Sequence, residues 1–150
     1  MIKVMFVCHG NICRSPMAEF LFKELVKKEG KEKEFSIKSS ATTSEELGNP
    51  VHYGTRAVLN RLNISCSGKY AEKLQASDYN NYDYFIGMDE KNRSNMLRIF
   101  GGDKGGKIKL LLDFTGEFRD VADPWWTGDF EATYKDVSNG IKALYEFLTK

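Results

Sequence analysis

The sequence predicts an α/β fold: one domain over residues 1–150, built on a four-stranded parallel sheet with helices on both faces. Two observations support this prediction. Short apolar stretches alternate along the chain with segments whose apolar residues recur at helical spacing, which is typical of parallel strands joined by right-handed helical crossovers. The first apolar stretch, residues 2–7, leads within a few residues into Ser15-Pro16, a strong helix start because proline is favoured at early helical positions.

The later elements follow the same alternation. The first helix is expected to end at Gly30, since glycine commonly terminates helices. The last helix is the clearest, because apolar residues recur from Phe130 to Leu148 at spacings of three and four. Further strands are expected at residues 35–39, 82–89 and 107–114, and further helices after Pro50 and after Asp89.

Bulk composition limits the classes of function. Hydrophobic residues make up 41% of the chain and charged residues 29%, as in ordinary soluble domains. The net charge of +1 gives no reason to expect a nucleic acid or a membrane surface as a partner, and there is no run of about 18 apolar residues that could span a bilayer. The 3 cysteines, an odd number, do not indicate a disulfide framework. We therefore expect a reducing, cytoplasmic location.

The loop after the first strand carries the strongest chemical signal. Cys8 ends the strand, and Arg14 stands at the start of the helix. Backbone N–H groups of a tight loop at a helix N-terminus form an anion site, and Gly10-Asn11 suits the bend because both residues accept a positive φ. An arginine fork can hold two phosphate oxygens, and the same positive field favours a cysteine thiolate over a thiol. We therefore expect a nucleophile inside a phosphate-binding loop, formed by His9, Gly10, Asn11, Ile12, Cys13, Arg14 and Ser15.

Two separated motifs resemble those of one known family. The stretch from Val7 to Pro16, VCHGNICRSP, resembles the active-site loop of the low-molecular-weight protein tyrosine phosphatases. Asp123-Pro124-Trp125-Trp126 resembles the general-acid loop of that family. The resemblance extends over nearly the whole chain, and two motifs in the expected order make it specific.

This resemblance implies a two-step hydrolysis of phosphotyrosine in proteins, or of small aryl phosphates. Cys8 is expected to attack phosphorus and form a cysteinyl-phosphate, Arg14 to hold the phosphate, and Asp123 to act first as general acid and then as general base. The residues expected to support the loop through hydrogen bonds are Asn11, Ser15 and Ser39. No metal or cofactor is expected, because the arginine and the loop amides supply the positive charge, and phosphate or other oxyanions are expected to bind in the site.

Residues at the mouth of the pocket are expected to influence the choice of substrate. The expected rim consists of His9, Glu45, Trp125 and Trp126, with Glu46 as a further contributor. An exposed tryptophan beside the pocket suits an aryl phosphate. The family commonly has an aromatic residue near the position of Glu46. This chain instead has two acidic residues there, Glu45 and Glu46, and we therefore expect acidic peptides to be disfavoured.

Several other residues are open to both a structural and a functional interpretation. His52 and Asp89 stand at expected helix starts, and we interpret both as capping or surface residues rather than catalytic ones. Residues 101–107 satisfy G-x4-G-K, but a strand follows them where a nucleotide-binding loop requires a helix, so a turn is expected. Cys66 lacks a metal-ligand partner at short spacing and is interpreted as structural.

The family resemblance raises two further expectations. It implies that Cys13 can form a reversible disulfide with Cys8 under oxidation, whereas a packing role for Cys13 is the alternative. Family members often carry a histidine that braces the phosphate loop, and here Gly68 or a neighbour takes its place.

Three other functions remain to be weighed against a tyrosine phosphatase. Protein arginine phosphatases of the same fold have a threonine where this chain has Ile12, which favours tyrosine. Arsenate reductases need additional redox cysteines, and only Cys66 is available. A module that binds phosphotyrosine without turnover would need neither the nucleophile Cys8 nor the acid Asp123.

Overall fold

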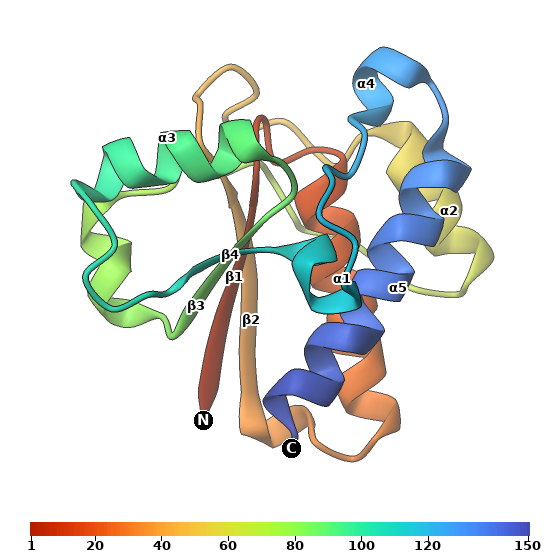
Figure 1. The fold of residues 1–150 in the computed structure, drawn as a ribbon. Coiled ribbons are helices and arrows are strands. Elements are labelled where there is room, and N and C mark those ends of the chain that lie inside the picture. Colours follow the sequence, from red (N-terminus) through yellow and green to blue (C-terminus); the bar gives the residue numbers. More distant parts are fainter.

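Four parallel strands form the centre of the molecule (Figure 1). The structure is a computed structural model, and it describes residues 1–150. The strands lie in the order β2-β1-β3-β4, with β1 at Ile2–Cys8, β2 at Phe35–Ala41, β3 at Tyr84–Gly87 and β4 at Ile108–Leu110. β1 pairs with both β2 and β3. The predicted four-stranded parallel sheet is therefore confirmed, and Cys8 ends one of its interior strands.

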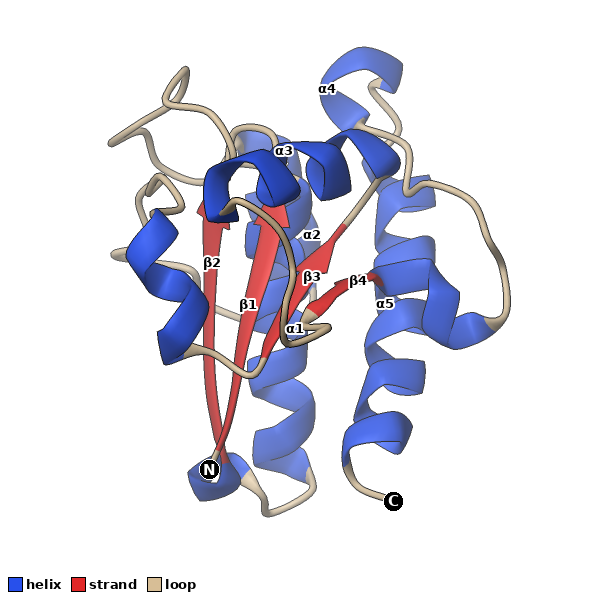
Figure 2. Ribbon diagram, turned by 60° about the vertical axis from the view of Figure 1, so that its left-hand side comes forward, coloured by secondary structure: helices blue, strands red, loops and turns tan.

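Helices cover both faces of the sheet, as predicted (Figure 2). The long helices are α1 (Arg14–Lys28), α2 (Tyr53–Arg61), α3 (Glu90–Phe100) and α5 (Phe130–Leu148). Val4 and Phe6 of β1 belong to the core shared with α1 and α5, whereas Met5 and Val7 belong to a second core with Met96 of α3. Neighbouring strand residues point to opposite sides of the sheet, and because a core covers each side, β1 is apolar on both faces. None of the helices combines the length and apolar character that a membrane span requires.

The predicted strand over residues 107–114 is wrong in its second half. β4 ends at Leu110, and Leu111–Thr115 forms a 3-10 helix, η3. In a strand, Leu111 and Leu112 would point to opposite faces of the sheet. In η3 both side chains are instead buried in the core that contains α5. The need to bury two consecutive leucines on one side explains why the chain turns here.

The other elements differ from the prediction mainly in length. The predicted strand over residues 82–89 is reduced to Tyr84–Gly87, and Asp83 just before it accepts a hydrogen bond from the backbone N–H of Lys3. The short helices η1 (Glu32–Glu34), η2 (Ala76–Asn81) and α4 (Pro124–Thr127) were not predicted. They span too few residues to show an apolar period.

The carboxyl ends of the strands meet at one edge of the sheet, toward which the arrows in Figure 2 point. The β1–α1 loop, the β2–α2 loop, the start of α3 and the short helix α4 all gather there (Figures 1 and 2). Open parallel sheets bind their ligands at this edge, because the loops that follow the strands converge on it.

Candidate active site

The β1–α1 loop leaves consecutive backbone donors without partners inside the protein. Asn11 adopts a φ of 60°, in the left-handed region that asparagine tolerates, and it bends the chain between Cys8 and Arg14. None of the backbone N–H groups of residues 9–13 donates to an acceptor in the protein. Residues 10–13 are nevertheless buried, and buried N–H groups are rarely left unpaired. The loop is therefore built to receive an anion beside Cys8.

Two hydrogen bonds from Ser15, the second residue of α1, hold the sulfur of Cys8. Ser15 Oγ lies 3.0 Å from Cys8 Sγ, and the Ser15 N–H donates to the same sulfur at 3.4 Å. The Asn11 amide donates to Ser15 Oγ at 2.8 Å and to Ser39 Oγ at 2.9 Å, while its oxygen accepts from the backbone N–H of Glu72. Because Ser15 Oγ already accepts from Asn11, its own hydrogen is available to the sulfur. This arrangement stabilises a thiolate at Cys8.

A buried ion pair lies behind this network. Ser39 Oγ donates to the carboxylate of Glu19 on α1 at 2.5 Å, and the Lys69 ammonium donates to the Ser39 carbonyl at 2.8 Å. Lys69 Nζ also lies 3.7 Å from Glu19 Oε1, and Lys23 donates to the other Glu19 oxygen. Burial lowers the pKa of Lys69, and Glu19 partly opposes this. Gly68 or a neighbour was expected at the place of the histidine that braces the phosphate loop in the family. The neighbour that contacts Ser39 is Lys69.

The guanidinium of Arg14 is fixed from two sides. It is almost fully buried, with 2% of the residue exposed. Nη1 donates to Asp89 Oδ2 at 2.8 Å and to the carbonyl of Val121 at 2.9 Å, and Nη2 donates to Asp123 Oδ2 at 3.4 Å. Asp89 Oδ1 accepts from the backbone N–H of Asn92 at 2.7 Å, so the expected helix cap is confirmed. The same carboxylate therefore caps α3 and orients Arg14.

Asp123 enters the site from a loop far along the chain. It caps α4 by accepting from the Trp125 N–H at 3.0 Å, while its other oxygen faces Arg14. Burial works against the charge of Arg14, but Cys8, Asp89 and Asp123 outweigh it and hold the arginine pKa above its usual value. The guanidinium therefore keeps its positive charge at neutral pH.

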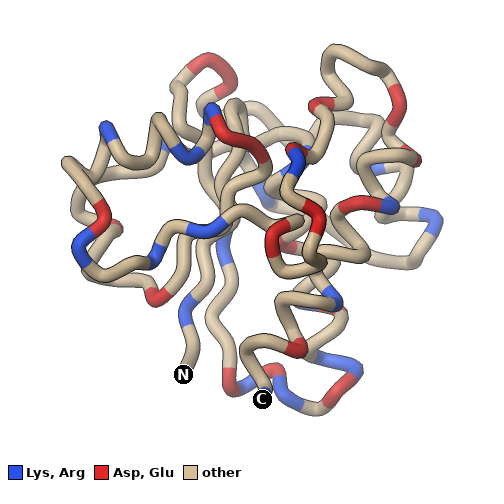
Figure 3. The backbone as a smooth tube through the Cα atoms, viewed as in Figure 1, with Lys and Arg blue, Asp and Glu red and all other residues tan.

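A cavity of about 550 Å³ opens at this edge of the sheet, lined by Cys8, Arg14 and Asp123 together. At its mouth, His9 Nε2 lies against the carboxylate of Glu45, and Glu46 and Lys91 also line the opening. Neither Glu46 nor Lys91 forms an ion pair. Figure 3 shows acidic residues in the β2–α2 loop and at the start of α3 around this end of the molecule.

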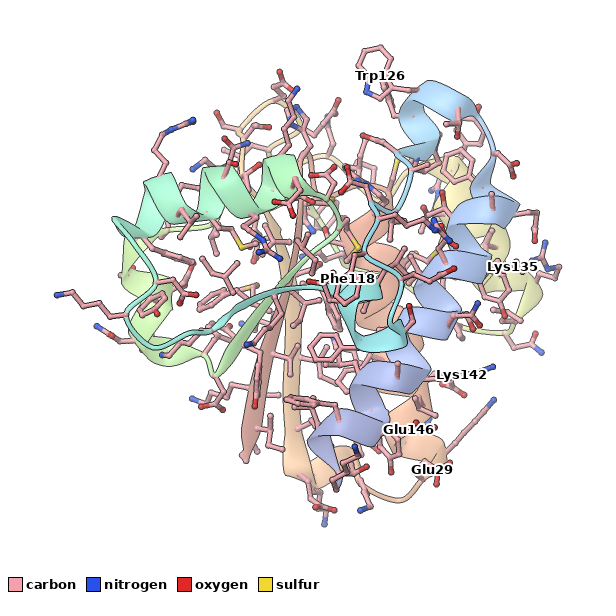
Figure 4. The ribbon with its side chains drawn as sticks, viewed as in Figure 1. Glu29, Phe118, Trp126, Lys135, Lys142 and Glu146 are labelled. Atoms are coloured by element: carbon pink, nitrogen blue, oxygen red, sulfur yellow. The ribbon has the colours of Figure 1, made fainter.

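Both tryptophans of α4 are exposed at the pocket. Trp125 is 54% exposed and Trp126 is 82% exposed, and both line the cavity. Figure 4 shows Trp126 projecting outward from α4. The two rings therefore present apolar surface beside a strongly polar site.

Several of the groups that shape the site have no clear signal in the sequence. Glu19 and Lys23 stand four residues apart, which is typical of an exposed surface pair on a helix, and nothing local indicates that Glu19 is buried. Lys69 lies in a polar segment without periodicity. Only Asp89 carried a signal, since it ends a predicted strand at the edge where Cys8 lies.

The chain is similar to known proteins over its whole length. A family model described as low molecular weight phosphotyrosine protein phosphatase matches residues 3–150. The low molecular weight protein-tyrosine-phosphatase YfkJ of Bacillus subtilis is 38% identical over 152 residues, covering 100% of this chain and 97% of that protein. The crystal structure of YfkJ superposes with a TM-score of 0.95, covering 99% of this chain and 94% of YfkJ.

Two other solved structures are similar over the whole length. SP-PTP, a low molecular weight protein tyrosine phosphatase from Streptococcus pyogenes, is 40% identical with a TM-score of 0.88, covering 100% of this chain and 95% of its own. A Drosophila arginine phosphatase is 25% identical with a TM-score of 0.89, covering 99% of both chains. The fold is therefore shared with phosphatases named for two different phosphorylated residues.

Proposed function

Because this chain belongs to the low molecular weight protein-tyrosine-phosphatase family, we propose that it hydrolyses phosphotyrosine in proteins, and small aryl phosphates, through a cysteinyl-phosphate on Cys8. One observation carries the proposal. The unpaired N–H groups of residues 9–13 lie in the loop that joins Cys8 to Arg14, and Asp123 lines the same cavity. A dianion, a nucleophile and a proton donor can thus meet in one place.

In the first step, the Cys8 thiolate attacks phosphorus in line with the ester oxygen. The loop N–H groups and the Arg14 guanidinium bind the three equatorial oxygens and stabilise the charge that spreads over them. The sulfur–phosphorus bond forms as the bond to the phenolic oxygen breaks. Asp123, protonated at this stage, donates its proton to that oxygen, so that a neutral phenol leaves.

In the second step, water replaces the phenol in the pocket. Asp123, now a carboxylate, takes a proton from the water as its oxygen attacks phosphorus. The sulfur–phosphorus bond breaks, and inorganic phosphate and the Cys8 thiolate are released. The Ser15 hydroxyl, 3.0 Å from Cys8 Sγ, donates to the departing sulfur and makes it a better leaving group.

We propose tyrosine rather than arginine as the phosphorylated residue. Ile12 lines the cavity with an apolar side chain, and the exposed rings of Trp125 and Trp126 offer stacking surface for a phenyl group. The proposed partners are therefore proteins that carry phosphotyrosine, and the phosphate that they release binds in the loop. Because the mechanism needs a free thiolate and all three cysteines are unpaired, we propose a reducing, cytoplasmic setting.

The first experiment measures hydrolysis of p-nitrophenyl phosphate and of a phosphotyrosine peptide, with a metal chelator present. Cys8→Ser is expected to abolish both activities, whereas Cys66→Ser, a buried cysteine outside the cavity, is expected to retain them. Asp123→Ala is expected to lower the peptide rate by roughly 10²–10⁴-fold, and Asp120→Asn serves as its control in the same segment. Activity that survives Cys8→Ser would refute the cysteinyl-phosphate route.

A second assay compares kcat/KM for phosphotyrosine and phosphoarginine peptides of the same sequence. The proposal expects phosphotyrosine to be preferred. Ile12→Thr is expected to reduce the preference for phosphotyrosine over phosphoarginine, because a hydroxyl then lines the cavity in place of an ethyl group. A wild-type preference for phosphoarginine would replace tyrosine by arginine and leave the cysteine mechanism intact.

A further inference from the structure

His52 joins two parts of the site although it does not line the cavity. Its backbone N–H donates to the carbonyl of Ile12 in the phosphate-binding loop at 2.8 Å. Its Nδ1 accepts from the backbone N–H of Gly54 at 3.0 Å, which caps α2. The expected capping role is therefore confirmed, and the residue is tied to the loop that carries Cys8.

The imidazole ring of His52 also contacts the segment that carries Asp123. It stacks on Phe130, the first residue of α5, with ring centroids 5.1 Å apart and planes 15° apart. Trp125 of α4 meets it edge-on at 5.7 Å and 79°. These two contacts lie on either side of the turn that joins α4 to α5, so one ring holds both ends of that turn.

The packing beneath this stack is close. A Cβ built on Gly54 would lie 2.5 Å from the ring carbons of Phe130, so the glycine is what allows the ring to lie directly on the backbone of α2. Burial, with a smaller contribution from Arg56, lowers the pKa of His52, while Glu46 opposes this. A lowered pKa favours the neutral ring, in which the Nδ1 lone pair accepts the hydrogen bond from Gly54.

Few other contacts hold α4 in place. It has four residues, of which only Pro124 is buried. Its Trp125 has two connections: the ring meets His52, and the backbone N–H donates to the Asp123 carboxylate. If the Trp125 ring moved, its backbone N–H would move with it, and the Asp123 carboxylate that accepts from this N–H would be displaced.

We propose that His52 is a positioning residue for the general acid, its ring holding the Asp123–Trp125 turn in place against the phosphate-binding loop. This inference rests on the proposed function of Asp123. It predicts that loss of the His52 ring slows hydrolysis only for some substrates. Substrates whose phenol needs a proton in order to leave are hydrolysed more slowly, whereas substrates with an acidic phenol are not.

The test measures kcat/KM, which reports the steps up to departure of the phenol. The substrates are p-nitrophenyl phosphate, whose phenol is acidic, and phenyl phosphate, whose phenol is not. His52→Asn keeps a capping side chain but removes the ring. It is expected to lower kcat/KM for phenyl phosphate about tenfold, a part of the roughly 10²–10⁴ that a general acid supplies, and for p-nitrophenyl phosphate less than about twofold.

Two further variants separate the ring from the cap. His52→Phe keeps an aromatic ring and removes the cap, and it is expected to restore the wild-type ratio of the two rates. Phe130→Leu removes the other ring of the stack while His52 still caps α2, and it is expected to change the ratio in the same direction as His52→Asn.

Asp123→Asn provides the reference for a lost proton donor. If it changes the ratio of the two rates and His52→Asn and Phe130→Leu do not, the positioning role is refuted while the proposed function stands. An equal loss on both substrates in the His52 and Phe130 variants would likewise refute it, because it indicates a general structural role. If Asp123→Asn itself leaves the ratio unchanged, both the general-acid assignment and this inference fail.

Discussion

Nη1 of Arg14 lies 2.8 Å from Oδ2 of Asp89, which joins the first residue of α1 to the cap of α3 at the edge of the sheet. The carboxylate leaves the other guanidinium nitrogen, Nη2, facing Asp123 and the cavity. Asp89 thereby caps α3 and sets the direction of the Arg14 guanidinium.

We predict that Asp89→Asn lowers kcat/KM for p-nitrophenyl phosphate by about 10²-fold, since misplacing a catalytic group by about 1 Å has an effect of this size. Asparagine is a good helix cap, so stability should change little, whereas Asp89→Ala should lose about 1 kcal/mol as well. Asp129→Asn, which alters the cap of α5 in the same way, is the control. Wild-type kinetics in Asp89→Asn would show that Arg14 does not need this partner.

A second prediction concerns the stability of the buried ion pair. Glu19→Gln removes the charge that faces Lys69 and leaves the ammonium without its buried partner. The free energy of unfolding should fall by about 3 kcal/mol, because breaking one side of a buried pair is strongly destabilising. Glu24→Gln, at a partly exposed position on the same helix that pairs only with the exposed Lys28, should alter it by less than about 0.5 kcal/mol. Urea unfolding at pH 7 measures both values, and similar losses would contradict a buried charge pair.

A third prediction separates the two cysteines of the loop by reactivity. Burial above all, with the charges of Cys8 and Asp123, raises the pKa of Cys13 to about 12, and Arg14 only partly opposes this. At pH 8 its thiolate fraction is therefore about 10⁻⁴. Iodoacetamide should label Cys8 and spare Cys13, and inorganic phosphate should slow the labelling. Peptide mapping that found the label mainly on Cys13 would contradict the assignment of the nucleophile.

A fourth prediction concerns the peptide around the phosphotyrosine. Glu45 and Glu46 line the cavity mouth and Lys91 lies at the same opening, so two negative charges oppose one positive charge. Basic peptides should be hydrolysed with a higher kcat/KM than acidic ones, by up to about fivefold, since exposed ion pairs contribute at most about 1 kcal/mol each. Glu46→Gln should reduce the preference and Lys91→Gln should increase it. Equal rates on both peptides would refute the idea.

Much of the site could be predicted because its key residues are close in sequence. Cys8, Asn11 and Arg14 lie on one loop, and strand, glycine-asparagine bend and helix start are local signals. The same holds for the caps: Asp89 and His52 each bond to a backbone N–H within three residues. Local hydrogen bonding of this kind depends on residue type and position alone.

The remaining features depend on contacts between distant parts of the chain. Arg14 meets Asp89 across 75 residues and Asp123 across 109. The turn at Leu111, the burial of Glu19 against Lys69 and the stacking of His52 on Phe130 have no local signal, because each is decided by what packs beside it. The sequence by itself determined the strand–loop–helix that carries Cys8 and Arg14, the alternation of strands and helices, and the caps at Asp89 and His52. Only the tertiary structure decided which carboxylate orients Arg14 and which ring holds the Asp123 turn, because both depend on where the loops meet at the edge of the sheet.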